Sequence, residues 1–392
     1  MTRGKKGDER VIYLDHAATS WPKPPEVIEA MVDAMQMSAA NAGRGNHAMA
    51  VQAGRVLVRA RMALAELFGI ANGQDIAFAP NATFALNLAI KGALREGDHV
   101  IATMTEHNSV RRPLEYLRKT KAVEVDYLKV DTRGRVDLRE LTRLFRSETK
   151  MVVCCHSSNV LGSILPIGEI GSIAKDHGAL FLVDAAQSAG VVGINAAAMQ
   201  IDLLAFPGHK GLLGPQGTGG LYIHPSVDLE PLLHGGTGSQ SENADQPDVR
   251  PDRYEAGTQN TAAVAGLLAG VNRVKRIGVE AIYQKEWRLA QLLMEGLARI
   301  PGLTLLGPPM GVARTGVVSF VIKGVDSAEI AFRLDREFGI AVRPGMHCSP
   351  LAHEAAGTMG SGAVRASVGV DTSEAEVEEM LDAMYTLYGE NK

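Results

Sequence analysis

Ala179-Leu-Phe-Leu-Val-Asp184-Ala-Ala-Gln187 is the stretch that decides the fold. Its apolar run does not alternate with polar residues, which is typical of a strand covered on both faces. Similar short runs, separated by amphipathic stretches, occur at Asp75 to Ala79, His99 to Met104, Val123 to Val130, Met151 to Cys155 and Leu203 to Phe206. This alternation predicts βαβ units and an α/β fold built on a mostly parallel sheet.

The composition is that of a large globular protein. The chain has 392 residues, of which 46% are hydrophobic and 21% charged, with a formal net charge of −4. We expect no nucleic-acid partner, because there is no basic excess. We also expect no membrane association, because no run of about 18 apolar residues occurs. The three cysteines cannot form a disulfide framework, which favours a reducing, cytoplasmic setting.

The C-terminal third shows a different pattern. A long helical region is expected from about Thr261 to Ile300, and strands follow near Val317 to Ile322 and Ile340 to Arg343. This order favours a separate α+β part after the βαβ region. We therefore place a domain boundary near residue 275.

Asp184 and Gln187 follow directly on the buried strand. Ligands of open α/β sheets bind beyond the carboxyl ends of strands. A carboxylate there is costly unless it meets a cation or strong donors. The ring nitrogen of pyridoxal phosphate is such a partner, because a carboxylate keeps it protonated as an electron sink. The alternative is that Asp184 only caps the following turn.

Two further stretches fit the same cofactor. Phe206-Pro-Gly-His-Lys-Gly-Leu-Leu-Gly-Pro-Gln-Gly217 is another strand end that leads into a glycine-rich loop. Lys210 on this loop suits a Schiff base, although a lone lysine is more often a solvated surface charge. Asn81-Ala-Thr83 follows a strand and opens a helix, where backbone N–H groups and a hydroxyl can hold a phosphate. A plain N-cap by Asn81 or Thr83 is an equal alternative.

Other nucleotide and metal motifs are absent. The sequence has no GxxxxGK[ST] and no GxGxxG between a strand and a helix. His353-Glu354 lacks the second histidine of HExxH, and Cys154-Cys155-His156 lacks CxxC spacing. We therefore predict no metal site and interpret Cys154 and Cys155 as core or near-core thiols.

Taken in order, the motifs resemble the cysteine desulfurases, within the class V aminotransferase group of fold-type I pyridoxal phosphate enzymes. The resemblance rests on Tyr13-Leu-Asp-His-Ala-Ala-Thr-Ser20, Glu106-His107, Ser158-Asn-Val-Leu-Gly162, Val183-Asp-Ala-Ala-Gln187, Gly208-His-Lys210, Glu255-Ala-Gly-Thr-Gln-Asn260, Arg343-Pro-Gly-Met-His-Cys348 and Val364-Arg-Ala-Ser367. It implies a large domain (26–275) with a mostly parallel seven-stranded sheet that binds pyridoxal 5'-phosphate. A smaller C-terminal α+β domain (276–392) is expected to carry the substrate arginine and the nucleophilic cysteine, with an N-terminal segment (1–25) packed against it.

The resemblance also implies a role for each matching residue. Lys210 attaches the cofactor, Asp184 pairs with the pyridinium nitrogen, Gln187 approaches the ring hydroxyl, and His107 stacks on the ring as a further catalytic residue. Asn159 lies beside cofactor and substrate, Thr83 and His209 contact the phosphate, and Ala82 is among the cofactor-binding residues. Thr258 reaches the phosphate of a partner subunit, which implies a homodimer. Arg365 holds the substrate carboxylate, with Arg343 nearby, because a guanidinium fits a carboxylate in a bidentate manner.

Cys348 is the residue that selects the chemistry. It lies between Gly345-Met-His347 and Ser349-Pro350, a loop-like setting. A thiolate is the nucleophile, so nearby positive groups would help, and His347 and Arg343 are candidates. Without the resemblance, an inert structural thiol is the favoured interpretation. With it, Cys348 receives the sulfur of L-cysteine as a persulfide, releases L-alanine, and passes the sulfur to an acceptor protein for iron–sulfur cluster assembly or another thiolation pathway.

Two departures and two alternatives accompany this prediction. Pro207 stands where relatives often carry Ser or Thr, and proline offers neither a hydroxyl nor an N–H to a phosphate. Met346 stands where many desulfurases of the Suf type have His. A selenocysteine lyase, a C–S lyase or another class V aminotransferase is the alternative on the same scaffold. A non-enzymatic sulfur carrier is a third possibility, against which the presence of Lys210 argues.

Overall fold

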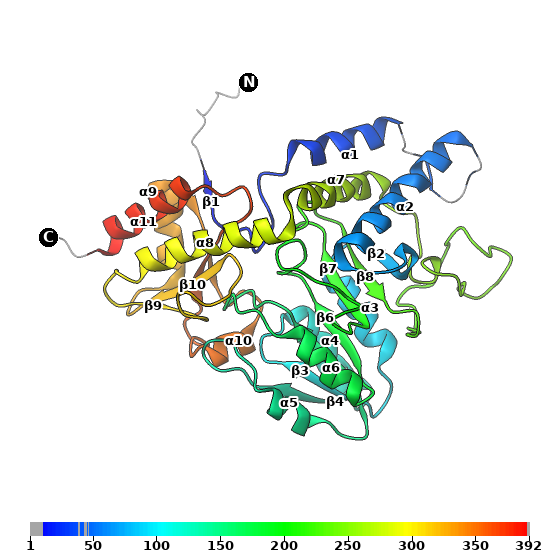
Figure 1. The fold of residues 1–392 in the computed structure, drawn as a ribbon, viewed down its shortest axis with the longest axis horizontal. Helices are drawn as coiled ribbons and strands as arrows, with labels where there is room; N and C mark the ends of the chain where they lie inside the picture. The colour runs from blue at the N-terminus through cyan, green and yellow to red at the C-terminus, as the bar shows by residue number, and fades with distance from the viewer. Residues whose placement is uncertain (1–10, 38–39, 43–44, 46, 390–392) are drawn as a thin grey trace.

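A seven-stranded sheet forms the centre of the computed structural model, which describes residues 11–37, 40–42, 45 and 47–389 (Figure 1). Its strand order is β2 (Ile76–Ala79), β8 (Gly219–Ile223), β7 (Leu203–Pro207), β6 (Leu180–Asp184), β5 (Thr149–Cys155), β3 (His99–Thr103) and β4 (Glu124–Leu128). Only the pairings of β8 with β2 and with β7 are antiparallel among these described strands. The predicted α/β fold with a mostly parallel sheet is confirmed, and β8 is the strand that the apolar runs did not predict.

Helices cover both faces of this sheet. One face packs against α2 (Ala48–Phe68), α5 (Leu138–Leu144), α6 (Ile167–Asp176) and α7 (Thr261–Ile277), and the other packs against α3 (Ala82–Ala93) and α4 (Asn108–Thr120). In β5, Val152 and Cys154 face the first layer, whereas Met151 and Val153 face the second. Since successive side chains of a strand point to opposite faces, a strand buried on both sides is apolar throughout. α1 (Pro25–Met37) packs along α7.

A second, antiparallel sheet forms the C-terminal part. Its order is β12 (Arg343–Gly345), β13 (Ala363–Ser367), β10 (Val317–Ile322) and β9 (Leu303–Leu305). It shares one core with α8 (Val279–Leu297), α9 (Ser327–Phe338) and α11 (Glu374–Tyr388). Three shorter helices are α10 (Pro350–Ala355) and the 3-10 helices Gly73–Asp75 and Asp252–Tyr254.

The N-terminal segment lies against this C-terminal part. β1 (Ile12–Tyr13) pairs in parallel with β11 (Ile340–Ala341), and Figure 1 shows β1 beside α9 and α11. This contact is consistent with the segment predicted for residues 1–25, of which 1–10 lie outside the described residues. The domain boundaries themselves stay predictions.

Two predicted elements differ from the structure. The helical region predicted from about Thr261 to Ile300 is confirmed, but it consists of two helices, α7 and α8, that meet at Gly278. Gly278 has φ 91°, a left-handed conformation that glycine adopts without the steric cost of a Cβ. The strand predicted at Ile340 to Arg343 is divided into β11 and β12, which belong to different sheets.

The fold brings the carboxyl ends of the parallel strands to the same edge. β5 ends at Cys155, β6 at Asp184 and β7 at Pro207, next to the first residues of α3 and α4. This is the edge at which open α/β sheets bind ligands. In the described part of the chain, no helix combines the length and the hydropathy that crossing a membrane requires.

Candidate active site

A cavity of about 210 Å³ lies at this edge of the sheet. Its walls come from the ends of β5, β6 and β7, the starts of α3 and α4, and the loops beyond them. The lining residues are Ala18, Asn81, Ala82, Thr83, His107, Ser109, Cys155, Asn159, Asp184, Ala186, Gln187, Pro207, His209 and Lys210. The structure therefore brings together every residue that was predicted to bind the cofactor, with the exception of Thr258.

Lys210 and Asp184 provide a buried amine and a buried carboxyl in this cavity. Burial lowers the pKa of Lys210 to about 8, against the opposing charge of Asp184. Burial also raises the pKa of Asp184, while the N–H of Ala186 and the charge of Lys210 act in the opposite direction. Asp184 Oδ1 accepts from Ala186 N at 2.8 Å, so the predicted turn cap is present. Among the described residues, Oδ2 has no hydrogen-bond partner, and it remains available to a ligand.

The start of α3 forms one end of the cavity. Asn81 is the N-cap of this helix, and its side chain accepts from Phe84 N at 2.9 Å. The cap by Asn81 leaves Thr83 free for the cavity, where its hydroxyl lies 2.9 Å from Ser109 Oγ. Free N–H groups and hydroxyls at a helix N-terminus favour an anion. The N-cap alternative is confirmed for Asn81, and the phosphate contact of Thr83 stays a prediction.

His107 occupies the N-cap position of α4. Its Nδ1 accepts from Ser109 N at 3.0 Å and lies 2.7 Å from Ser109 Oγ. Burial, followed by the positive charge of Lys210, lowers the pKa of His107 to about 4. The imidazole is therefore neutral near pH 7, and its ring forms a wall of the cavity. Gln187 forms another part of the wall and donates from Nε2 to Ala17 O at 3.0 Å.

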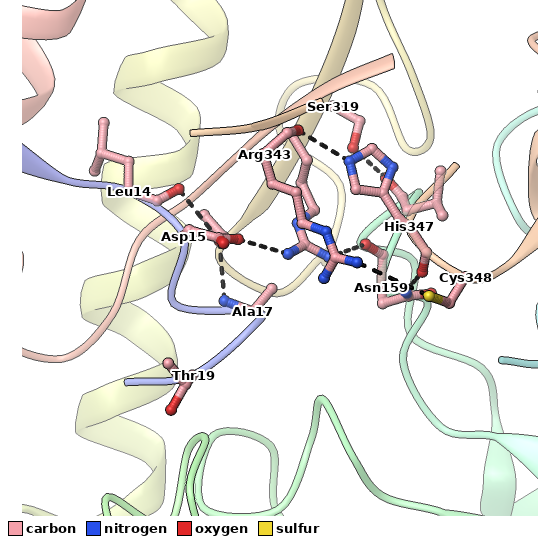
Figure 2. A network of polar contacts seen from close by, with 12 residues as sticks. Leu14, Asp15, Ala17, Thr19, Asn159, Ser319, Arg343, His347 and Cys348 are labelled. Atoms are coloured by element: carbon pink, nitrogen blue, oxygen red, sulfur yellow. Dashed lines mark hydrogen bonds and ion pairs between the residues drawn. The ribbon is translucent and has the colours of Figure 1, made fainter. Parts of the chain in front are cut away.

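Asn159 connects this cavity with the loop that carries Cys348. Its Nδ2 donates to His347 O at 2.6 Å, and its Oδ1 accepts from Ser349 Oγ at 2.7 Å. Asn108 N, next to His107, donates to Cys348 O at 2.8 Å. Cys348 is exposed, and its Sγ lies 3.8 Å from Arg343 Nη2. Figure 2 shows Asn159, Arg343, His347 and Cys348 in one polar network.

The expectation that His347 adds positive charge beside Cys348 is wrong. Its imidazole is buried between His353 Nε2, 3.3 Å from Nδ1, and Arg343 O, 3.0 Å from Nε2. Burial, followed by the charge of Arg365, lowers the pKa of His347 to about 3. A neutral His347 leaves Arg343 as the predicted cation that contacts the thiol.

Arg365 lies on β13, fully buried behind the same network. Its Nη1 donates to Asn159 O at 3.1 Å, and its Nη2 donates to Asp15 Oδ1 at 2.7 Å. Nε has no partner among the described residues. Arg365 is buried and is not among the residues that line the cavity, so its contact with the substrate carboxylate stays a prediction.

Thr258 is not part of this cavity. It lines a separate hollow of about 280 Å³ with Phe84, Tyr254 and Glu255, among other residues. Its predicted contact with a partner's cofactor stays a prediction.

Several residues of the site escaped prediction from sequence. Cys155 lines the cavity, Asp15 orients Arg365, and Glu106 lies buried under the His107 turn. Glu106 Oε1 accepts from Thr103 Oγ1 at 2.5 Å and from Cys155 N at 2.6 Å, and burial raises its pKa to about 8. Glu106 and Asp15 occur in the quoted motifs, but only long-range contacts reveal what they do.

The donor set of the cavity fits pyridoxal 5'-phosphate. An amine suits its aldehyde, a carboxylate with a free oxygen suits its ring nitrogen, and an imidazole wall suits its ring. Thr83 at a helix N-terminus and His209 suit its phosphate.

The chain is similar to known proteins over nearly its whole length. The Aminotransferase class-V family matches residues 12–380. A probable cysteine desulfurase of Methanothermobacter thermautotrophicus is 36% identical over 389 residues, which cover 96% of this chain and 95% of the relative. The cysteine desulfurase of Haloferax volcanii is 32% identical and covers 98% of this chain and 91% of its own. The apo structure of a cysteine desulfurase from Thermococcus onnurineus matches with a TM-score of 0.91 at 36% identity, over 96% of this chain and 94% of the other. The chain therefore belongs to the class V aminotransferase family.

Proposed function

We propose that this protein is a pyridoxal-5'-phosphate-dependent cysteine desulfurase, which converts L-cysteine to L-alanine and stores the sulfur as a persulfide on Cys348. One observation carries the proposal. Cys348 is an exposed thiol beside Arg343. Asn159, which lines the cavity that contains Lys210 and Asp184, hydrogen-bonds to the loop that carries Cys348. A transaminase on the same scaffold would not require a thiol at this place.

The residues divide the work as follows. When bound, pyridoxal phosphate supplies the electron sink that makes the Cα–H of an attached amino acid acidic. Lys210 would attach it, Asp184 would keep its ring nitrogen protonated, and His107 would cover its ring. Thr83, Ala82 and His209 would hold the phosphate end, with Gln187 at the ring hydroxyl. Arg365 and Arg343 would bind the carboxylate of the substrate beside Asn159.

Proton transfer is assigned to the Nζ amine of Lys210. Because burial lowers its pKa to about 8, roughly a tenth of this amine is neutral at pH 7 and can accept the Cα proton. Cys348 Sγ, as a thiolate, attacks the sulfur of the substrate. An S–S bond forms, the substrate's C–S bond breaks with its electron pair left on carbon, and a proton completes alanine. The products are L-alanine and the Cys348 persulfide, so no external oxidant or reductant is needed.

The finer parts of the assignment follow from the same proposal. A persulfide must be unloaded before the next turnover, so we infer a sulfur-acceptor protein and ping-pong kinetics. Iron–sulfur cluster assembly is the pathway that we favour for the acceptor. Thr258, outside the cavity of its own chain, supports a homodimer in which it reaches the partner's phosphate. All three cysteines are free thiols, which supports a reducing, cytoplasmic location.

One incubation tests the proposal. The purified, cofactor-loaded protein is mixed with L-cysteine, and alanine and protein-bound sulfane sulfur are measured together. We expect equal amounts of both in the first turnover, and loss of both in Cys348→Ser with the visible absorbance of the cofactor retained. Cys154→Ala is the matched control, because this thiol lies in the core away from the cavity. Transfer of the amino group to a keto acid, without alanine and sulfane sulfur, would instead indicate an aminotransferase.

A further inference from the structure

Several donors converge on the carbonyl oxygen of His209, the residue that precedes Lys210. This oxygen accepts from Ser20 N at 3.0 Å, from Ser20 Oγ at 3.1 Å and from Lys23 Nζ at 2.9 Å. Thr19 Oγ1 also lies 3.0 Å from it. A carbonyl oxygen has two lone pairs, so it is fully satisfied without a proton from Thr19.

Thr19 has a second partner on the same residue. Its Oγ1 lies 3.1 Å from His209 Nδ1. A hydroxyl carries one proton, so Thr19 can donate either to the carbonyl or to Nδ1, but not to both. Three other donors already exceed the two lone pairs of this carbonyl oxygen, so the Thr19 proton gains a less crowded acceptor in Nδ1. The ring proton of a neutral His209 is then on Nε2.

His209 is neutral near pH 7. Burial, together with the positive charges of Lys210 and Lys23, lowers its pKa to about 4. A neutral imidazole has one N–H, so its tautomer decides whether a given ring nitrogen donates a hydrogen bond to a ligand or accepts one from it. His209 lines the cavity, and its Nε2 has no hydrogen-bond partner among the described residues.

The neighbouring backbone cannot replace this donor. Pro207 has no N–H, and Gly208 N already donates to Thr218 O at 2.8 Å. If the ring proton were on Nδ1, Nε2 would present a lone pair to an anion and repel it. If the proton is on Nε2, the same nitrogen donates a hydrogen bond.

We propose that Thr19 is a positioning residue that sets the tautomer of His209, so that Nε2–H faces the phosphate-binding end of the cavity. The inference rests on the proposed function, because the anion is the phosphate of the cofactor. It also explains how the loop holds a phosphate although Pro207 offers no hydroxyl there.

The tautomer can be measured without cofactor and without activity. Protein labelled with ¹⁵N-histidine is examined near pH 7 by long-range ¹H–¹⁵N correlation, and His209 is assigned by the loss of its signals in His209→Asn. We expect the Nε2–H pattern in the wild type and in Thr19→Ser, which keeps the hydroxyl. Thr19→Val should populate the Nδ1–H form, whereas Thr142→Val, on the exposed side of α5, should change nothing. An Nδ1–H pattern in the wild type overturns the inference whether or not any variant folds.

A second measurement compares two ligands that differ only in the phosphate. Removal of one hydrogen bond to a charged group typically costs roughly tenfold to a hundredfold in affinity. We expect Thr19→Val to lose about that much affinity for pyridoxal 5'-phosphate and less than about twofold for pyridoxal. Equal losses for both ligands contradict the inference. Failure of the proposed function gives a different result. The wild-type protein would then bind neither pyridoxal 5'-phosphate nor pyridoxal, or it would form no alanine. The histidine spectrum would still report the tautomer of His209 in either case.

Discussion

Arg365 donates from Nη2 to Asp15 Oδ1 across 2.7 Å, and this partly buried ion pair joins β13 to the segment after β1. Asp15 Oδ1 and Asn159 O hold two of the three guanidinium nitrogens, and Nε stays unpartnered among the described residues. The network continues through Asn159 to the Cys348 loop (Figure 2). The proposed substrate-binding group is thus oriented before any substrate arrives, which lowers the cost of ordering it on binding.

Arg365→Lys tests this orientation. Lysine keeps the charge but lacks the planar fork, so it cannot contact Asp15, Asn159 O and a carboxylate at once. We expect the KM for L-cysteine to rise by about tenfold or more, with a smaller change in kcat and an unchanged cofactor absorbance. Steady-state alanine formation checks this. Arg333→Lys, in the exposed pair with Glu337 on α9, is the matched control. Equal KM values for wild type and Arg365→Lys would show that Arg365 does not bind the substrate.

The pKa of Lys210 gives a prediction with a definite sign. In the cofactor-free protein, this pKa is lowered to about 8, and the charge of Asp184 opposes the decrease. Asp184→Asn removes the opposing charge, so the pKa of Lys210 should fall further and its amine should become reactive at lower pH. Competitive acetylation followed by peptide mass spectrometry over pH 5 to 10 measures the midpoint. The exposed Lys119 serves as the internal reference. A midpoint that moves upward in Asp184→Asn would contradict the assignment of Asp184 as the neighbouring charge.

The parallel sheet could be predicted because its strands are apolar on both faces, but β8 could not. β8 begins with Gly219 and Gly220, and glycine is a poor strand former. The structure shows why no larger residue stands there. A Cβ at Gly219 would lie 2.6 Å from Phe206 O, and one at Gly220 would lie 2.6 Å from Phe206 Cζ. Close packing against β7 therefore requires glycine at these two positions, and glycine lacks the strand propensity from which β8 could have been predicted.

The site was predictable where a residue follows a strand end, as Asp184 and Lys210 do. Resemblance rather than periodicity pointed to Cys348, Arg365 and Asn159. The role of Asp15 could not be predicted, because its partner Arg365 is separated from it by most of the chain. The charge state of His347 could not be predicted either, because it depends on how deeply the imidazole is buried, which a short sequence motif does not show.

The buried pair of Arg61 and Glu255 predicts a strong effect on stability. Arg61 Nη2 lies 2.7 Å from Glu255 Oε1 and 2.6 Å from Oε2, and Phe78 N donates to Oε1 at 2.6 Å. Arg61→Met leaves the carboxyl of Glu255 buried without its cation, which should lower the free energy of unfolding by about 3–5 kcal/mol. Urea unfolding followed by circular dichroism checks this.

The pH dependence of the Arg61→Met defect has a definite direction. Burial already raises the pKa of Glu255 against the charge of Arg61, so removal of Arg61 raises it further in the folded state. A folded-state pKa above the unfolded value of about 4.3 means that the folded protein binds the proton more tightly. The defect should therefore shrink as the pH falls from 7 toward 5. Arg333→Met, which leaves an exposed Glu337, should show neither the defect nor the pH trend.

Asn159 controls the backbone that carries the nucleophile. His347 has φ 48° and Cys348 has φ 60°, a left-handed conformation that residues other than glycine rarely adopt. The side chain of Asn159 bonds to both neighbours of Cys348, at His347 O and Ser349 Oγ. Asn159→Ala should let this turn relax to a commoner conformation and move Sγ away from Arg343. We expect alanine formation at saturating L-cysteine to fall by about tenfold or more.

Thiol labelling separates this effect from any loss of cofactor. Cys154 is buried in the core, but Cys155 lines the cavity, so the reagent, an aromatic disulfide, is used on cofactor-free protein in a Cys155→Ala background, where it reports on the exposed Cys348. The labelling rate should rise in Asn159→Ala, because the turn gains mobility. Ser349→Ala removes only one of the two bonds and should give an intermediate rate. If both variants label like the wild type while activity falls, Asn159 acts on the cofactor or the substrate rather than on the Cys348 turn. The strained backbone would then have to be maintained by its other contact, the hydrogen bond from Asn108 N to Cys348 O.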